Sequence, residues 1–145
     1  MTHDRSVTYL KRASAISIGF GLLMFLSILL GLEPAFAWFL DLAHLPLDGT
    51  QGFASDSELL LGAICGGLLA GFGVVMWRIT IDVYAKHPAL GARIIKAGIV
   101  TWFLIDSTGS VLAGAWFNVV LNSGFLALFM LPLFLSNMAT SARPA

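Results

Sequence analysis

The chain contains little charge and a single cysteine. Asp, Glu, Lys and Arg together make up 11% of its 145 residues, whereas hydrophobic residues make up 58%. A soluble domain of this size carries about a quarter charged residues, so the composition argues against a water-soluble globule and predicts that lipid is the solvent. The same composition excludes a disordered chain. The lone Cys65 has no partner for an intrachain disulfide, and we interpret it as a small packing residue.

Motifs of the common enzyme and cofactor classes are also missing. The sequence contains no Cys-x-x-Cys, HExxH, phosphate-binding loop or nucleophile elbow. The histidines His3, His44 and His87 all fall outside the long apolar stretches, which argues against haem ligation within a membrane. Asp41 and Asp48 are too scattered around His44 to predict a metal site. We therefore expect no catalytic residues, no metal, no cofactor and no nucleic-acid partner.

Four apolar stretches have the length of about 20 residues that a helix needs to cross a bilayer. They run from Ala13 to Leu32, from Leu59 to Trp77, from Ile94 to Ala113 and from Phe117 to Ser136. Each is predicted to be helical, because lipid offers no hydrogen-bond partners to open backbone groups. The sequence thus predicts an all-α membrane protein whose four transmembrane helices form a bundle, with residues 1–145 making a single membrane domain.

The basic residues predict how these helices are oriented. They precede the first stretch, separate the second from the third, or follow the fourth (Arg5, Lys11, Arg12, Arg78, Lys86, Arg93, Lys96 and Arg143). The connections 33–58 and 113–116 contain no Lys or Arg. Because Lys and Arg stay on the cytoplasmic side of a membrane, both termini are predicted to be cytoplasmic in a bacterial inner membrane. The connection 33–58 is then outside.

An alternative interpretation concerns the N-terminal stretch. Lys11 and Arg12, the apolar run after them and the segment Ala35-Phe36-Ala37 resemble a secretory signal with a cleavage site. The apolar run spans about 20 residues, whereas signal cores usually span about 7 to 15. Pro34 and Phe36 also crowd the cleavage site. We therefore favour a first helix that is retained, since cleavage would leave only the other three spans.

The predicted outer connection has two parts of different character. The segment from Pro34 to Leu45 reads PAFAWFLDLAHL, and its concentration of aromatic and aliphatic residues predicts a short interfacial helix on the outer leaflet. The segment from Pro46 to Ser57 is rich in Gly, Asp, Thr and Ser, which is typical of a water-exposed connection. Asp56 or Ser57 is positioned to cap the second transmembrane helix.

Small residues at helical spacing predict how the helices pack. The second stretch carries two such rows on adjacent faces (Gly62, Gly66, Ala70 and Gly73 in one, Ala63, Gly67 and Gly71 in the other), and the first stretch carries Ala13, Ser17 and Gly21. Small residues let two helix backbones approach closely in lipid. We expect this packing to occur mainly within the chain. Homodimerisation through the glycines is the alternative, because two rows exceed what one neighbouring helix needs.

One ionisable residue, Asp106, lies inside the third stretch. Placing a carboxyl group at that depth costs about 2.5 to 3.5 kcal/mol, so such a residue usually faces the interior of a bundle. The turn around Gly114 is short, and Asp106 and Asn122 are equally distant from it along the chain. In a tight antiparallel pair, these two residues therefore lie at the same depth, about 12 Å below the turn.

Ser110 and Asn118 are paired around the turn in the same way, which predicts a continuous polar patch of Asp106, Ser110, Asn118 and Asn122. Ser107 and Thr108 are expected instead to bond back to their own helix backbone. No basic residue reaches Asp106, since Lys96 is about 15 Å away along the helix. We favour a polar clasp that fixes the two helices, and the alternative is a proton or cation site.

Two segments carry a family resemblance. GAICGGLLAGFGVVMW (Gly62–Trp77) and TWFLIDSTGSVLAGAWFNVVLNSGFLALFMLPL (Thr101–Leu133) resemble a group of small bacterial inner-membrane proteins with four spans. That group has a glycine-rich second span and an Asp-Ser…Gly…Asn…Asn pattern in its third and fourth spans, which here covers Asp106, Asn118 and Asn122. The resemblance extends over roughly the second half of the chain, and it implies the four-span architecture without implying a reaction.

The function expected from these observations is that of a small, non-enzymatic protein of the inner membrane. It would be accessory to a larger complex or act as an oligomer, with the polar Asp/Asn cluster inside its bundle. The alternative is a small proton- or cation-coupled transporter subunit that uses Asp106. An enzyme is not expected, because the sequence offers no convergent acid, base and nucleophile.

Overall fold

The computed structural model describes residues 1–141, which form helices and short connections with no strand among them. Four of the helices are long and apolar enough to cross a membrane. They are α1 (His3–Leu29), α3 (Asp56–Arg78) with its π-helical continuation η1 (Ile79–Tyr84), α4 (Pro88–Leu112) and α5 (Trp116–Ser141). The protein is therefore an all-α, multi-pass membrane protein, as the sequence predicts. Arg143 lies outside the described residues.

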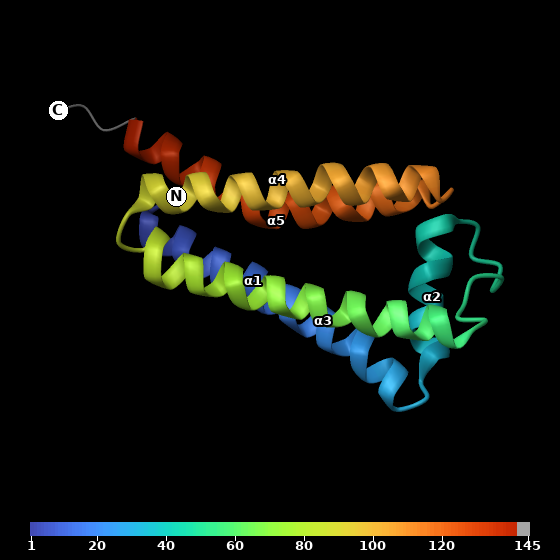
Figure 1. Ribbon diagram of the computed structural model, residues 1–145. Helices are drawn as coiled ribbons and strands as arrows, with labels where there is room; N and C mark the ends of the chain where they lie inside the picture. The colour runs from blue at the N-terminus through green and yellow to red at the C-terminus, as the bar shows by residue number, and fades with distance from the viewer. Residues whose placement is uncertain (142–145) are drawn as a thin grey trace.

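The four long helices form two antiparallel pairs, α1 with α3 and α4 with α5 (Figure 1). The pairs approach each other most closely where the N-terminus, η1 and the start of α4 meet, which we call the η1 end. Towards the opposite end the pairs diverge, and the short helix α2 (Glu33–His44) lies across them and contacts both α1 and α5. This is the α2 end, and the transverse course of α2 suits a helix lying on a membrane surface.

The helices extend past the predicted spans at the η1 end. α1 begins at His3 instead of near Ala13, and the hydroxyl of Thr2 caps it by accepting a hydrogen bond from the Arg5 backbone. α4 begins at Pro88, a residue suited to the first turn because it has no N–H to satisfy there. The apolar stretches mark only the part of each helix that can lie in lipid, whereas the helical backbone continues into the charged flanks.

One row of small residues in α3 packs against α1. A Cβ atom placed on Gly66 would lie 2.8 Å from the carbonyl oxygen of Gly21 and 2.9 Å from the backbone nitrogen of Phe25. The backbones are therefore in direct contact, as small-residue rows allow in lipid. In contrast, no atom of the described neighbouring segments lies within 4 Å of such a Cβ on Gly67 or Gly71. The expectation that both rows pack within the chain is wrong for these two glycines.

The apolar core occupies the half of the bundle nearest the η1 end. It is built from buried residues of all the long helices (Leu10, Ala13, Met76, Tyr84, Ala92, Ile95, Ile99, Phe129 and Leu133). Trp102 packs at the edge of this core, with its ring centroid 4.9 Å from that of Phe125. Trp102 therefore packs within the bundle.

At the α2 end, an aromatic cluster takes the place of the aliphatic core. Phe36 of α2 is 3% exposed, and its ring lies within 6.2 Å, between centroids, of the rings of Phe20, Phe39 and Phe53. Phe20 belongs to α1 and Phe53 to the segment that leads into α3. The cluster therefore packs α2 against the α1–α3 pair. The short helix predicted for this segment is therefore present, and one of its faces is packed against protein.

The connection from α2 to α3 is held by local hydrogen bonds. Both carboxyl oxygens of Asp41 accept from the backbone N–H of Gly49 at 3.1 Å. The hydroxyl of Thr50 donates to Asp48 at 2.6 Å, and this bond lowers the pKa of the Asp48 carboxyl. α3 then starts with a capping box between Ser55 and Glu58. The helix cap is thus Ser55, which corrects the prediction of Asp56 or Ser57.

Candidate functional site

The polar cluster predicted around Asp106 lies between α4 and α5, in the half of the bundle nearest the α2 end. α4 ends at Leu112 and α5 begins at Trp116, so three residues reverse the chain. Gly114 adopts a positive φ of 79°, which glycine accommodates without steric cost. This tight reversal brings residues at equal distances from Gly114 to the same depth, as the sequence argument requires.

The first of the two predicted pairs forms directly. The side-chain amide of Asn118 donates to the hydroxyl oxygen of Ser110 at 2.8 Å. Ser110 in turn donates its own proton to the backbone carbonyl of Asp106, one turn earlier on α4, also at 2.8 Å. The hydroxyl therefore acts as donor and acceptor at once, and the pair links α5 to the α4 backbone.

The second pair includes a residue that the sequence argument placed elsewhere. The side-chain amide of Asn122 donates to the hydroxyl of Ser107 at 3.3 Å, and both side chains are buried. The prediction that Ser107 is poorly placed for the patch is thus wrong, because its side chain faces α5. Thr108, which lies on the exposed side of α4, does bond back to the carbonyl of Leu104 at 2.7 Å.

Asp106 itself is partly buried at the centre of this cluster. Its carboxyl group lies near the side chains of Asn122 and Ser110, whose own hydrogen bonds go to the Ser107 hydroxyl and to the Asp106 backbone carbonyl. Along α4 it follows Ile99 and Trp102 at intervals of three and four residues, so it continues the row that faces the bundle interior. Among the described residues, no ion pair involves Asp106 and no group of His, Cys, Asp and Glu is arranged to hold a metal.

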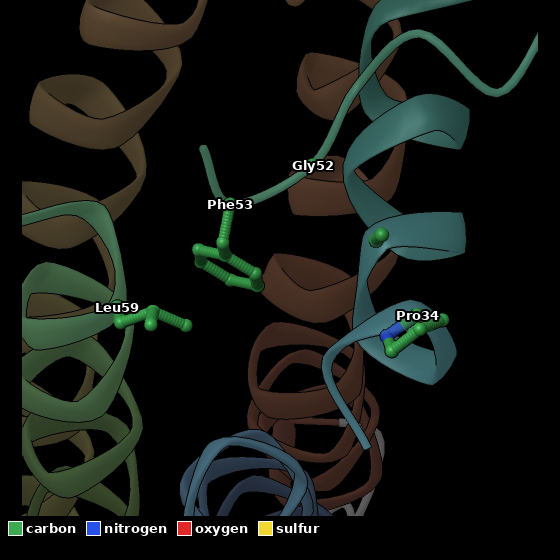
Figure 2. A pocket seen from close by; sticks show the side chains of 5 residues that line it. Pro34, Gly52, Phe53 and Leu59 are labelled. Atoms are coloured by element: carbon green, nitrogen blue, oxygen red, sulfur yellow. The ribbon is translucent and has the colours of Figure 1, made fainter. Parts of the chain in front are cut away.

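Two shallow hollows lie near the α2 end. One has a volume of about 320 Å³ and opens beside the cluster, with Ser107 and Thr108 as its polar residues among apolar side chains of α4 and α5. The other, of about 440 Å³, lies between α2, the following connection and the start of α3, and Phe53 and Leu59 project into it (Figure 2). Both are lined mainly by apolar groups and neither contains Asp106.

A second polar cluster, at the η1 end, was not predicted from the sequence. The hydroxyl groups of Ser6 and Tyr84 lie 2.8 Å apart, and Ser6 donates to the carbonyl of Pro132 at 3.0 Å. Ser6 is 0% exposed and Tyr84 is 2% exposed. The imidazole of His3 packs on the Tyr84 ring, with the ring centroids 4.9 Å apart. This cluster ties α1, η1 and α5 together where the two helix pairs meet.

The sequence holds only a weak signal for this second cluster. Ser6 precedes Leu10, Ala13 and Ser17 at helical spacing, so it continues a row of small and apolar residues on α1. Tyr84 and Pro132 come from distant parts of the chain and carry no local pattern that connects them to Ser6.

Comparison with known proteins gives no match to a family model, to a curated protein or to a solved structure. The functional argument therefore rests on the residues and contacts described above.

Proposed function

We propose that this protein is a non-enzymatic component of a bacterial inner membrane that acts as a homodimer, assembled through the free face of α3. The observation that carries the proposal is the unequal use of the two small-residue rows. α1 covers the row that contains Gly66, whereas Gly67 and Gly71 have no neighbouring helix within the described chain. Helix association in lipid depends on such close-packing surfaces, so the uncovered row is a suitable contact for a second copy.

The free face of α3 is a continuous stripe. Leu60, Ile64, Gly67, Gly71 and Val74 follow one another at alternating intervals of four and three residues, and all five are exposed. Apolar side chains at both ends of the stripe flank the two glycines, an arrangement that lets the backbone of a second helix approach closely. In this proposal the Asp106 cluster is a clasp that keeps α4 and α5 in register.

The proposed orientation has both termini in the cytoplasm. The supporting argument is the distribution of Lys and Arg, which among the described residues gather at the η1 end and are missing from the connection 33–58 and from the turn 113–115. The partners of the protein in this proposal are the lipid bilayer and a second copy of the chain. If the protein instead belongs to a larger complex, a protein of different mass would be found together with it.

Cysteine cross-linking in native membranes tests the dimer. In a Cys65→Ser background, Leu60→Cys places a thiol on the stripe, and mild oxidation is expected to give a band of twice the monomer mass. Adding Gly67→Val should lower the yield about tenfold, which corresponds to a loss of about 1.4 kcal/mol of association. The unmodified chain provides the control, because Cys65 is exposed on a different face of α3.

Equal cross-linking through Cys65 and through residue 60 would contradict a specific interface on the stripe. A cross-linked band whose mass differs from twice the monomer mass would indicate an accessory role in a larger complex.

A second candidate function is supported by Asp106. Its carboxyl lies on the interior row of α4 without a basic partner among the described residues, in the half of the bundle where the helix pairs diverge. A carboxyl group in that position suits a proton or cation site, the default role of an intramembrane acid. The protein would then be a small proton- or cation-coupled transporter subunit.

The isosteric substitution Asp106→Asn separates the clasp from the transport site. Proteoliposomes with an internal pH-sensitive dye and an imposed potential measure proton flux. If Asp106 is a transport site, flux is expected to fall to the level of empty liposomes while the protein stays monodisperse. Ser107→Ala is the control, since it removes a contact of Asn122 but leaves the carboxyl in place. Misassembly of Asp106→Asn, with no flux through the unmodified protein, would identify Asp106 as part of the clasp alone.

A further inference from the structure

The η1 end of the α1–α3 pair carries a cation held against an aromatic ring. The ammonium group of Lys11 lies 5.1 Å from the centroid of the Trp77 ring. Lys11 precedes Ser14 by one turn, and Trp77 follows Gly73 by one turn, while Ser14 and Gly73 are themselves in contact. The contact between Lys11 and Trp77 therefore lies one turn beyond the contact between Ser14 and Gly73. At this end of the α1–α3 interface, two large side chains meet where small residues meet further along.

The next residue of α1 is also a cation that lies against an aromatic ring. The guanidinium group of Arg12 lies 5.7 Å from the centroid of the Tyr9 ring on the same helix. Neither Lys11 nor Arg12 forms an ion pair within the described part of the chain, where the one salt bridge joins Arg78 to Asp82 at 2.7 Å. Contact with a π face attracts a cation but does not neutralise its charge, so two positive charges remain available.

Lys11, Arg12 and Trp77 also lie where the sequence predicts the boundary of the membrane. The apolar stretches of the first and second spans end at Ala13 and Trp77, and aromatic residues such as Tyr9 and Trp77 gather at the level of lipid headgroups. Beyond Lys11, α1 exposes apolar side chains such as Ile16 and Leu23 along its length. A ligand that fits this surface combines a phosphate at the level of Lys11 with acyl chains that run along the helices.

We propose that Lys11 and Arg12 bind the phosphate headgroup of an anionic phospholipid at the η1 end of the α1–α3 pair. Trp77 and Tyr9 hold the two cations at headgroup depth, which reduces the side-chain freedom that is lost when the phosphate binds. The ammonium of Lys11 offers three donors and the guanidinium of Arg12 offers a planar fork, and both suit phosphate oxygens. This site is independent of the free face of α3 and of Asp106.

Native mass spectrometry of the full chain in detergent tests the site, with phosphatidylglycerol and phosphatidylcholine as probes. The expected result is a clear preference for phosphatidylglycerol. Lys11→Gln and Arg12→Gln should each weaken binding of that lipid about fivefold, the effect of one basic residue near an anionic headgroup. Lys86→Gln is the matched control, because Lys86 is exposed at the same end without a ring contact, and it should leave binding unchanged.

A second measurement uses the unmodified chain, so it does not depend on how the variants fold. Phosphatidylglycerol with a photoreactive headgroup should label the peptides that contain Lys11 and Trp77, while soluble glycerol phosphate should not compete, since it lacks acyl chains. Labelling elsewhere, an equal effect of Lys86→Gln, or equal binding of the two lipids would overturn the proposal. Competition by glycerol phosphate would show that the site binds a soluble phosphate and does not require a lipid.

Discussion

Replacing Gly66 with valine is expected to separate α1 from α3 and to lower the free energy of unfolding by at least about 3 kcal/mol, the upper part of the range for overpacked sites. A Cβ at this position would already lie 2.8 Å from the Gly21 carbonyl and 2.9 Å from the Phe25 nitrogen. Both atoms belong to the backbone of α1, so no side-chain rotation relieves the overlap. The helices must move apart, and the contacts along their whole length weaken. Steric-trapping or denaturant unfolding in detergent micelles measures the change.

The control for this prediction is one residue away on the same helix. Gly67→Val adds the same side chain, with the same helix propensity, at a position with open space around it. Its free energy of unfolding, measured at a dilution that keeps the protein monomeric, is expected to stay within about 0.5 kcal/mol of the unmodified value. Similar destabilisation by Gly66→Val and Gly67→Val would mean that the contact between Gly66 and Gly21 does not hold the pair together.

The architecture of this protein could be predicted because it depends on quantities that a sequence displays directly. The length of the apolar stretches fixed the number of membrane-crossing helices. The short turn at Gly114 fixed the depth of residues on either side of it, which is why the Ser110–Asn118 contact was predicted correctly. In both cases, local geometry determines the answer without knowledge of how distant segments pack.

The features that could not be predicted depend on the rotation of whole helices. Ser107 and Thr108 are adjacent, and both can bond back to α4, yet the orientation of α4 turns only Ser107 towards Asn122. Likewise, the two glycine rows of α3 look equivalent in the sequence, and only the position of α1 decides that Gly66 is covered and Gly67 is free. Rotation is set by the sum of all contacts, which no local pattern contains.

The contact of Ser6, Tyr84 and Pro132 at the η1 end could not be predicted from the sequence either. We expect Tyr84→Ala to weaken this contact strongly. Removing the ring and its hydroxyl leaves a cavity of roughly 100 Å³ at a site that is 2% exposed, and the cavity together with the lost burial costs about 3 to 5 kcal/mol of unfolding free energy. Gly91 of α4 packs against the backbone and Cβ of Tyr84, which alanine retains, so the substitution removes the ring and leaves this helix contact in place. Denaturant unfolding in micelles provides the measurement.

Tyr84→Phe separates the contribution of the ring from that of the hydroxyl. It removes the hydrogen bond to Ser6, but Ser6 keeps its bond to the Pro132 carbonyl, so no buried hydroxyl is left without a partner. Hydrogen bonds between transmembrane helices contribute about 0.6 kcal/mol on average, and the loss should be of that size. If Tyr84→Phe destabilises the protein as much as Tyr84→Ala, the hydrogen bond to Ser6, and not the packing of the buried ring, holds the two helix pairs together. The burial of Tyr84 and the packing of its ring on the imidazole of His3 favour packing as the larger contribution.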